Sequence, residues 1–357
     1  MRSWRPVRTG PRRRTRRVRV ALLLTVALVT VAAAVIAWNR QAGDSPPARA
    51  SIAPPLAVQQ KPKIVQRRLA HAAPLDLYAY DHAGMISGVA RRALARVYVP
   101  NSAADTVDVI DPHTYKVVDN FQVGALPQHV TPAHDLKTLY VNDDVGNTLT
   151  PIDPLTGRPG RPFPVDDPYN LYFTIDGRYA IVVAERLHRL DFRNAHTFRL
   201  VRALTVPCAD VRASPNAKVF YVADLAAGGV WEVDPARFKV IGFIHTGAGA
   251  HGLVVGRSGK VLYVANRNEG SVSVISFRTR KVVAKWHIPG GGSPDMGDVS
   301  ADGKVLWLSG RYNSEVYAID TRTGRLIARI PVGASPHGLS VWPQPGRFSL
   351  GHTGNMR

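Results

Sequence analysis

The chain has 357 residues, 45% of them hydrophobic, so it is long enough to bury a large core. Its single cysteine, Cys208, excludes an intramolecular disulfide framework, a Cys-x-x-Cys-His haem attachment and any zinc site built from several cysteines. The formal net charge is +20, but nine arginines lie within residues 1–20, and the other 337 residues carry only +11. Because no dense run of Lys or Arg occurs in those residues, we do not expect a nucleic-acid partner.

The N-terminus predicts a membrane anchor. Residues 1–19 form a basic segment, and residues 20–38 contain no charged side chain. Nineteen helical residues span about 30 Å, the thickness of a bilayer's hydrocarbon core. We therefore expect a cytoplasmic segment at 1–19 and an uncleaved transmembrane signal anchor at 20–38, with the rest of the chain on the extracytoplasmic side of the cell membrane. Cleavage near Ala48-Arg49-Ala50, which would release a secreted protein, remains the alternative.

Residues 39–74 read as a linker. They contain Pro46-Pro47, Pro54-Pro55 and Gln59-Gln60, and they show neither a helical nor a strand period. This composition predicts a flexible, partly extended stalk between the membrane and the next domain.

From residue 75 to residue 357 a phrase recurs about every forty residues. Its best-formed copy combines His251-Gly252-Leu253, Ser258-Gly259-Lys260, Tyr263-Val264-Ala265-Asn266 and Val272-Ser273-Val274-Ile275. Each copy predicts four short strands joined by tight turns, in which the glycine supplies a positive φ. A repeat of this length and content is typical of a β-propeller with one copy per blade.

The number of copies decides the number of blades. Six copies are complete between about residue 86 and Gly333, and residues 334–341 and 347–351 resemble the first two strands of a seventh. Residues 75–80 would supply its missing outer part. We therefore predict an all-β, seven-bladed β-propeller of four-stranded blades, monomeric and preceded by one transmembrane helix. A six-bladed ring with an extra tail remains the alternative.

The Tyr-Val-x-Asn strands and Val-Ile-Asp turns resemble the YVTN-repeat β-propeller family over roughly residues 76–357. The resemblance is specific for the fold and not for an activity. Similar repeats occur in extracytoplasmic binding proteins, in the haem-binding propeller of certain nitrite reductases, in quinoprotein amine dehydrogenase subunits and in lactonase-like hydrolases. The resemblance therefore implies a propeller and leaves binding protein, redox enzyme and hydrolase open.

Polar residues recur where the innermost strand of each blade begins, so they are expected at one mouth of the central channel. Imidazole and carboxylate groups together suit a metal or haem, although a histidine in a Pro-His-Gly phrase also has a purely structural role. We predict that this channel mouth binds a ligand and contains no catalytic residue. We predict no cofactor, although haem or a metal remains open. The site residues are His129, Asn170, Asp210, His251, Asp295 and His337.

These patterns favour a membrane-anchored extracytoplasmic module that binds a small molecule or a protein whose identity the sequence does not give. A haem- or metal-dependent redox enzyme is the second hypothesis. A lactonase-like hydrolase is the third, and its metal-binding candidates by location are Asn170, Glu185, Asp210 and Asp295.

Overall fold

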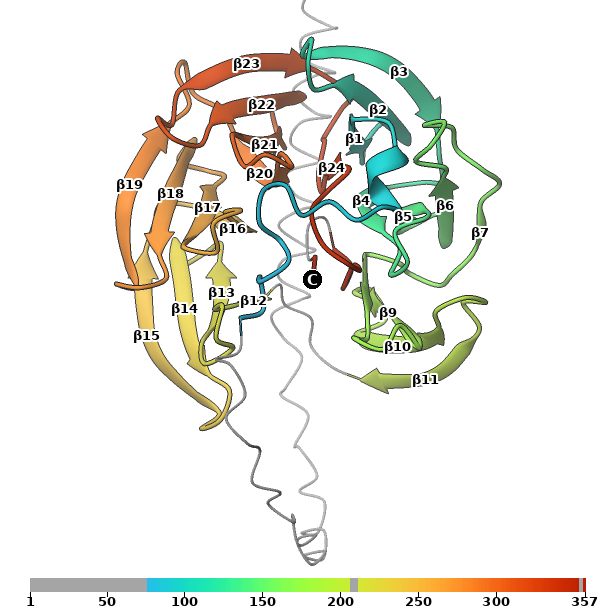
Figure 1. Cartoon of the computed structure of the whole chain (residues 1–357), viewed down its shortest axis with the longest axis horizontal. Coiled ribbons are helices and arrows are strands. Elements are labelled where there is room, and N and C mark those ends of the chain that lie inside the picture. The colour runs from blue at the N-terminus through green and yellow to red at the C-terminus, as the bar shows by residue number, and fades with distance from the viewer. Residues whose placement is uncertain (1–75, 206–210, 353–355) are drawn as a thin grey trace, which may run out of the picture. The chain divides into compact units, whose positions relative to one another are not determined.

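The computed structural model describes residues 76–205, 211–352 and 356–357. These residues form six four-stranded antiparallel sheets, which follow one another around a ring (Figure 1). Within these ranges, no helix is both long enough and apolar enough to cross a bilayer. The predicted basic segment, anchor and stalk at 1–19, 20–38 and 39–74, together with Asp210, lie outside the described residues.

Blade one joins the two ends of the domain. Its innermost strand, β24, comes from the C-terminal part of the chain and pairs with β1, Val97 lying opposite Val341. A short 3-10 helix, Ala90–Arg92, precedes β1. The strands of this blade are β24 (Ser340–Trp342), β1 (Arg96–Asn101), β2 (Thr106–Asp111) and β3 (Lys116–Gln122).

Blades two to four each use four consecutive strands, numbered from the channel outwards. Blade two contains β4 (Pro127–Pro132), β5 (Leu139–Asp143), β6 (Thr148–Ile152) and β7 (Phe163–Pro164). Blade three contains β8 (Asn170–Phe173), β9 (Tyr179–Ala184), β10 (Arg189–Asn194) and β11 (Leu200–Thr205). Blade four contains β12 (Val211–Ala213), β13 (Phe220–Asp224), β14 (Gly229–Asp234) and β15 (Lys239–His245).

Blades five and six repeat this order. Blade five contains β16 (Ala250–Val255), β17 (Val261–Asn266), β18 (Ser271–Ser276) and β19 (Lys281–His287). Blade six contains β20 (Pro294–Val299), β21 (Val305–Gly310), β22 (Glu315–Asp320) and β23 (Leu326–Pro331).

The predicted turns are present. Gly177, Gly259 and Gly303 have φ of 66°, 64° and 76°, the region that a side chain rarely adopts. After the third strand of a blade, an aspartate accepts a backbone N–H two residues further on: Asp153 accepts from Leu155 at 2.8 Å and Asp320 from Arg322 at 3.1 Å. These aspartates begin the turn into the fourth strand, so the repeated carboxylates are structural.

The prediction of seven blades is wrong. Residues 86–95 do not supply an innermost strand for blade one, so β24 takes that place and the expected seventh blade is used up. Residues 347–351 form only isolated bridges, Ser349 with Met356 and Gly351 with Tyr172. Residues 77–80 are turns against blade four, where the backbone N–H of Leu77 donates to the carbonyl of Pro215 at 2.8 Å.

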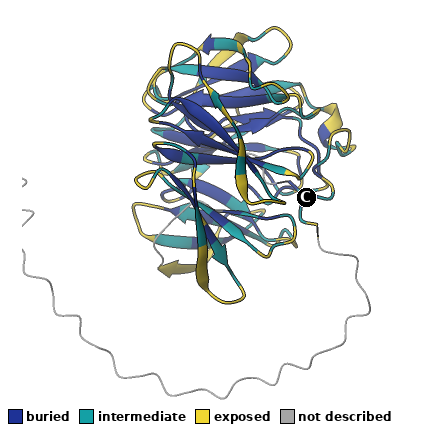
Figure 2. Cartoon of the chain, turned by 90° about the vertical axis from the view of Figure 1, so that its left-hand side faces the viewer, coloured by how far each residue is buried: buried dark blue, intermediate teal, exposed yellow. Residues whose placement is uncertain are grey.

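The core lies between neighbouring blades. In blades one, five and six the middle strands are buried along most of their length because neighbouring sheets pack face to face, whereas those of blades three and four are only partly buried. The outer strands β3 and β11 are largely exposed at the rim (Figure 2). Between blades six and one, Trp307 and Leu339 belong to a single buried cluster with Val97. Complete burial of such a side chain stabilises the fold by about 1.5–3 kcal/mol.

The C-terminal segment, residues 336–352, continues from one innermost strand to the next. Just before β24 pairs with β1, the segment contacts β4, where Val130 donates its N–H to the carbonyl of Gly338 at 3.0 Å. It then pairs with β8, where Phe173 donates to the carbonyl of Leu350 at 2.9 Å. Blades three and four stand farther apart than other neighbours in Figure 1, and the same segment links their inner strands. There, a guanidinium nitrogen of Arg212 in β12 lies 2.8 Å from Nδ1 of His352.

Candidate ligand-binding site in the channel

The channel cluster is formed by polar side chains from the innermost strands and the C-terminal segment. His129 lies in β4, His251 in β16 and Asp295 in β20, while His337 belongs to the C-terminal segment. His129, Asp295 and His337 are buried, and the side chain of His251 is 21% exposed. The propeller thus brings together four of the six residues that the sequence predicted.

Asp295 is the charged centre of this cluster. Its Oδ1 lies 2.6 Å from Nδ1 of His251 and accepts a hydrogen bond of 2.7 Å from Arg267. Complete burial acts to raise the pKa of Asp295. The positive charge that His337 carries at low pH, the hydrogen bond from His251 and the charges of His251 and Arg267 outweigh that effect and hold the pKa of Asp295 well below its ordinary value. The carboxylate is therefore ionised inside the channel.

His337 lies on the other side of this carboxylate. Its Nδ1 is 3.2 Å from the carbonyl oxygen of Gln128, and its Nε2 is 3.6 Å from Oδ2 of Asp295. Burial, followed by the positive charge of Arg311, lowers the pKa of His337 to about 3, although Asp295 acts in the opposite direction. The imidazole is therefore neutral at physiological pH.

Four imidazoles lie in sequence across the channel. The ring of His337 is 5.9 Å from that of His251 and 4.9 Å from that of His129, which is 5.0 Å from that of His352. Tyr169 packs against this row, with its ring 5.3 Å from His129. The row joins blades two and five through the C-terminal segment.

Two arginines make the rim of the cluster basic. Arg267 and Arg311 are the first residues after β17 and β21, so they occupy equivalent positions in blades five and six. Arg267 also approaches the exposed ring of Tyr312, its guanidinium lying 5.7 Å from the ring centre. Arg311 donates to Oγ of Ser102 at 2.9 Å and to the carbonyl of Ser335 at 3.1 Å. Both guanidiniums favour an anion over a cation on the solvent side of the cluster.

Asn170 begins the innermost strand β8, but within the described residues it forms no hydrogen bond to His129, His251, Asp295 or His337. It is buried, but its Oδ1 accepts the N–H of Leu171 at 2.9 Å and so supports the start of β8. The preceding Tyr169 faces the cluster instead. Glu185, considered as a metal ligand by location, is exposed at the end of β9.

The sequence prediction missed Arg267, Arg311 and His352. The two arginines could have been found by aligning the residue that follows the second strand of each blade, because both occupy that position. His352 has no such signal, since it lies beyond the last repeat and reaches the channel only because the C-terminal segment crosses it.

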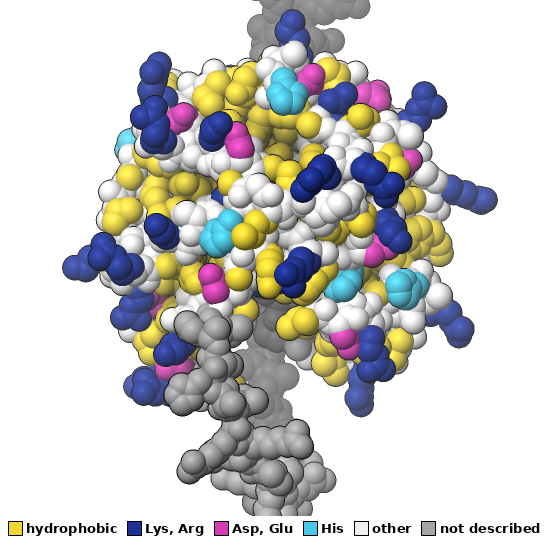
Figure 3. Space-filling view, in the orientation of Figure 1, with side chains coloured by type: hydrophobic (Ala, Val, Ile, Leu, Met, Phe, Trp, Pro, Cys, Tyr) yellow, Lys and Arg dark blue, Asp and Glu magenta, His cyan; other side chains and the backbone are white. Residues whose placement is uncertain are grey.

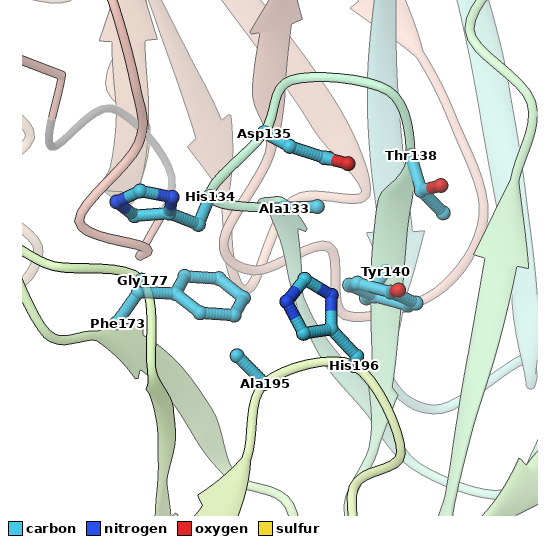
Figure 4. Close-up of a pocket in the computed structure, with 9 residues that line it drawn as sticks. All are labelled: Ala133, His134, Asp135, Thr138, Tyr140, Phe173, Gly177, Ala195 and His196. Atoms are coloured by element: carbon cyan, nitrogen blue, oxygen red, sulfur yellow. The ribbon is translucent and has the colours of Figure 1, made fainter.

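Hollows also lie away from the channel cluster, and two of them are lined by aromatic rings. The smaller, of about 120 Å³, is lined by residues of blades two and three, and Figure 4 shows the rings of His134, Phe173, His196 and Tyr140 gathered around it. The larger, of about 580 Å³, lies beside Tyr115, Trp307 and Trp342. Neither hollow includes a member of the channel cluster, so neither extends the predicted site.

Comparisons with solved structures find the same architecture at low sequence identity. A functionally unknown protein from Desulfotomaculum acetoxidans DSM 771 is 12% identical with a TM-score of 0.60, over 70% of this chain and 100% of that one. Dihydro-heme d1 dehydrogenase NirN in complex with DHE is 12% identical with a TM-score of 0.53, and the match covers 70% of this chain and 75% of NirN. Apo AztD from Citrobacter koseri is 10% identical with a TM-score of 0.50, and the match covers 72% of this chain and 98% of AztD. These likenesses show the fold alone.

No curated protein matches the chain. The sequence profile of one family does match, over residues 79–211 and 201–345, which together cover most of the propeller. The two matches divide at the connection between blades three and four. The repeats, the six closed blades and these matches agree, and the chain belongs to the YNCE-like beta-propeller family.

Proposed function

We propose that this protein is a ligand-binding propeller without catalytic activity, and that the channel cluster of His129, His251, Asp295 and His337 is its binding site. The observation that supports this most directly is the ionised Asp295, completely buried among imidazoles. Burying a carboxylate costs several kcal/mol unless it is paired, and here only Oδ1 is paired, by Arg267 and His251. Oδ2 has no hydrogen bond within the described residues, so this buried oxygen is available to a bound group, which favours a binding role.

We further propose that the domain functions outside the cytoplasm, tethered by the predicted anchor at residues 20–38 and the stalk at 39–74. The arginines before that span would keep the N-terminus on the cytoplasmic side. The surface of the propeller suits a small-molecule or protein ligand better than nucleic acid, because Lys and Arg are spread over the face in Figure 3 and do not form one continuous patch. The likeness to NirN concerns the fold, so dehydrogenase chemistry is not part of the proposal.

Native mass spectrometry of the whole chain, isolated in mild detergent from the cells that produce it, tests the proposal. We expect an additional bound mass on the wild-type protein. His251→Gln should reduce its occupancy by at least about tenfold, because a buried polar contact to a charged group is worth about 1.5–3 kcal/mol. His287→Ala is the matched control, since it removes an exposed imidazole at the end of β19. Equal occupancy in His251→Gln and wild type would contradict the assignment to the channel cluster.

A further inference from the structure

Two buried atoms with lone pairs face each other inside the channel cluster. Nε2 of His337 and Oδ2 of Asp295 are 3.6 Å apart. Oδ2 is buried and forms no hydrogen bond within the described part of the chain, whereas Oδ1 is occupied by His251 and Arg267. A buried carboxylate oxygen without a partner is costly, so this oxygen requires either a donor or a cation.

Which nitrogen of His337 carries the proton decides whether Oδ2 of Asp295 faces a hydrogen-bond donor or needs a cation. Nδ1 of His337 lies 3.2 Å from the carbonyl oxygen of Gln128, and only a protonated nitrogen can bond to a carbonyl. In the neutral ring this leaves Nε2 unprotonated, with its lone pair towards Oδ2 of Asp295. Two electron-rich atoms therefore face each other where a positive ion would be stabilised by both.

We propose that His337 Nε2, Asp295 Oδ2 and a ring nitrogen of His251 form a binding site for a divalent transition-metal ion of the zinc class. The proposal names the ligand of the site assigned above and therefore rests on the proposed function. One ligand atom from each of the three side chains lies within 4.8 Å of the others, and no other group of three within the described ranges meets this condition. Two ligands of a tetrahedral zinc ion are about 3.3 Å apart, close to the observed 3.6 Å.

The remaining contacts act as supports of such a site. Arg267 binds Oδ1 and leaves Oδ2 available, and the carbonyl of Gln128 fixes the ring of His337, as hydrogen bonds to metal ligands commonly do. Two imidazoles and one carboxylate favour zinc, cobalt or nickel over magnesium or calcium, which prefer oxygen ligands. Arg267 already neutralises the charge of Asp295, so a bound divalent ion would give the site a net positive charge. We therefore expect the fourth ligand to be an anion from solvent.

The test uses the full chain in detergent, stripped of metal with EDTA and then titrated with Zn²⁺ by calorimetry and with Co²⁺ by visible absorption. We expect one ion per chain and the intense visible bands of tetrahedral cobalt, with no response to Mg²⁺. Asp295→Asn and His251→Gln should each weaken binding at least about tenfold, the lower limit for disturbing a metal site. His287→Ala should bind like wild type. His251 is partly exposed, so its variant should fold even if Asp295→Asn does not, and thermal unfolding of each variant checks this.

The outcomes separate the two proposals. Absence of a one-to-one metal complex in the wild type, or equal affinity in both channel variants and wild type, overturns the metal site. If an organic or peptide mass is bound and is lost in His251→Gln while Zn²⁺ and Co²⁺ do not bind, the metal site is wrong and the ligand-binding function stands. If no bound mass depends on His251 and no metal binds, both proposals are wrong.

Discussion

Two aspartates in the same strand show how position within a blade sets the charge of a side chain. Asp295 is the second residue of β20, beside two histidines and Arg267, and it remains ionised. Three residues later, Asp298 is equally buried, and desolvation raises its pKa to about 7 although Arg257 lies 3.2 Å away. Arg257 is shared with Asp81, whose pKa burial raises to about 6. One guanidinium does not compensate two buried carboxylates, so Asp298 is protonated over part of the physiological range.

This difference predicts a pH-dependent stability. The folded-state pKa of Asp298, about 7, exceeds the roughly 3.9 of an unfolded aspartate. Between these values the folded protein holds a proton that the unfolded chain has released, so the free energy of unfolding falls as the pH rises. Asp298→Asn should remove up to about 1.4 kcal/mol per pH unit of this decline between pH 5 and 6.5. Urea unfolding of the wild type and the variant at several pH values measures this difference. If the free energies of unfolding of the two proteins change in parallel with pH, Asp298 is ionised throughout this range.

At the scale of elements, the repeats were more predictable than their ends. The short strands, the glycine turns and the aspartate turns follow from local patterns, and the structure contains them. The blade count was wrong because residues 334–341 look the same whether they begin a seventh blade or complete the first. Only the absence of a strand-forming pattern at residues 86–95 could have distinguished a seventh blade from a completed first blade. That signal is weak because the segment is short and irregular. His129, His251 and His337 were found because the repeat aligns them, whereas His352 lies beyond the last repeat.

The C-terminal segment should hold the ring together by packing as well as by pairing. Leu339 precedes β24 and is completely buried beside Trp307 and Val97. Leu339→Ala should therefore lower the free energy of unfolding by about 2–5 kcal/mol, the range for a truncated buried leucine. Leu187→Ala is the matched control, because that side chain is 47% exposed and should cost less than about 0.5 kcal/mol. Similar urea midpoints for the two variants would show that closure does not depend on this contact.

At the scale of the whole molecule, the direction of the chain across the membrane remains a prediction from the sequence. Phe238 lies in the turn between β14 and β15 and is 92% exposed, which makes it a suitable reporter of the propeller. In a Cys208→Ser background, Phe238→Cys should react with a membrane-impermeant maleimide added to intact spheroplasts. Ser3→Cys, before the apolar span, should react only after permeabilisation. The reverse pattern of labelling would place the propeller in the cytoplasm.

Closure by β24 also orders events during synthesis. Among the described strands, the one that completes the first blade is made last, because β24 follows the outer strand of blade six. Blades two to six can begin to pair as they emerge, but β1 keeps an open inner edge until β24 has been made. An unfinished chain therefore carries an exposed strand edge at its oldest part. A nascent propeller of this kind needs protection at that edge while the five later blades are made, and a product truncated before β24 is marked by the edge it cannot cover.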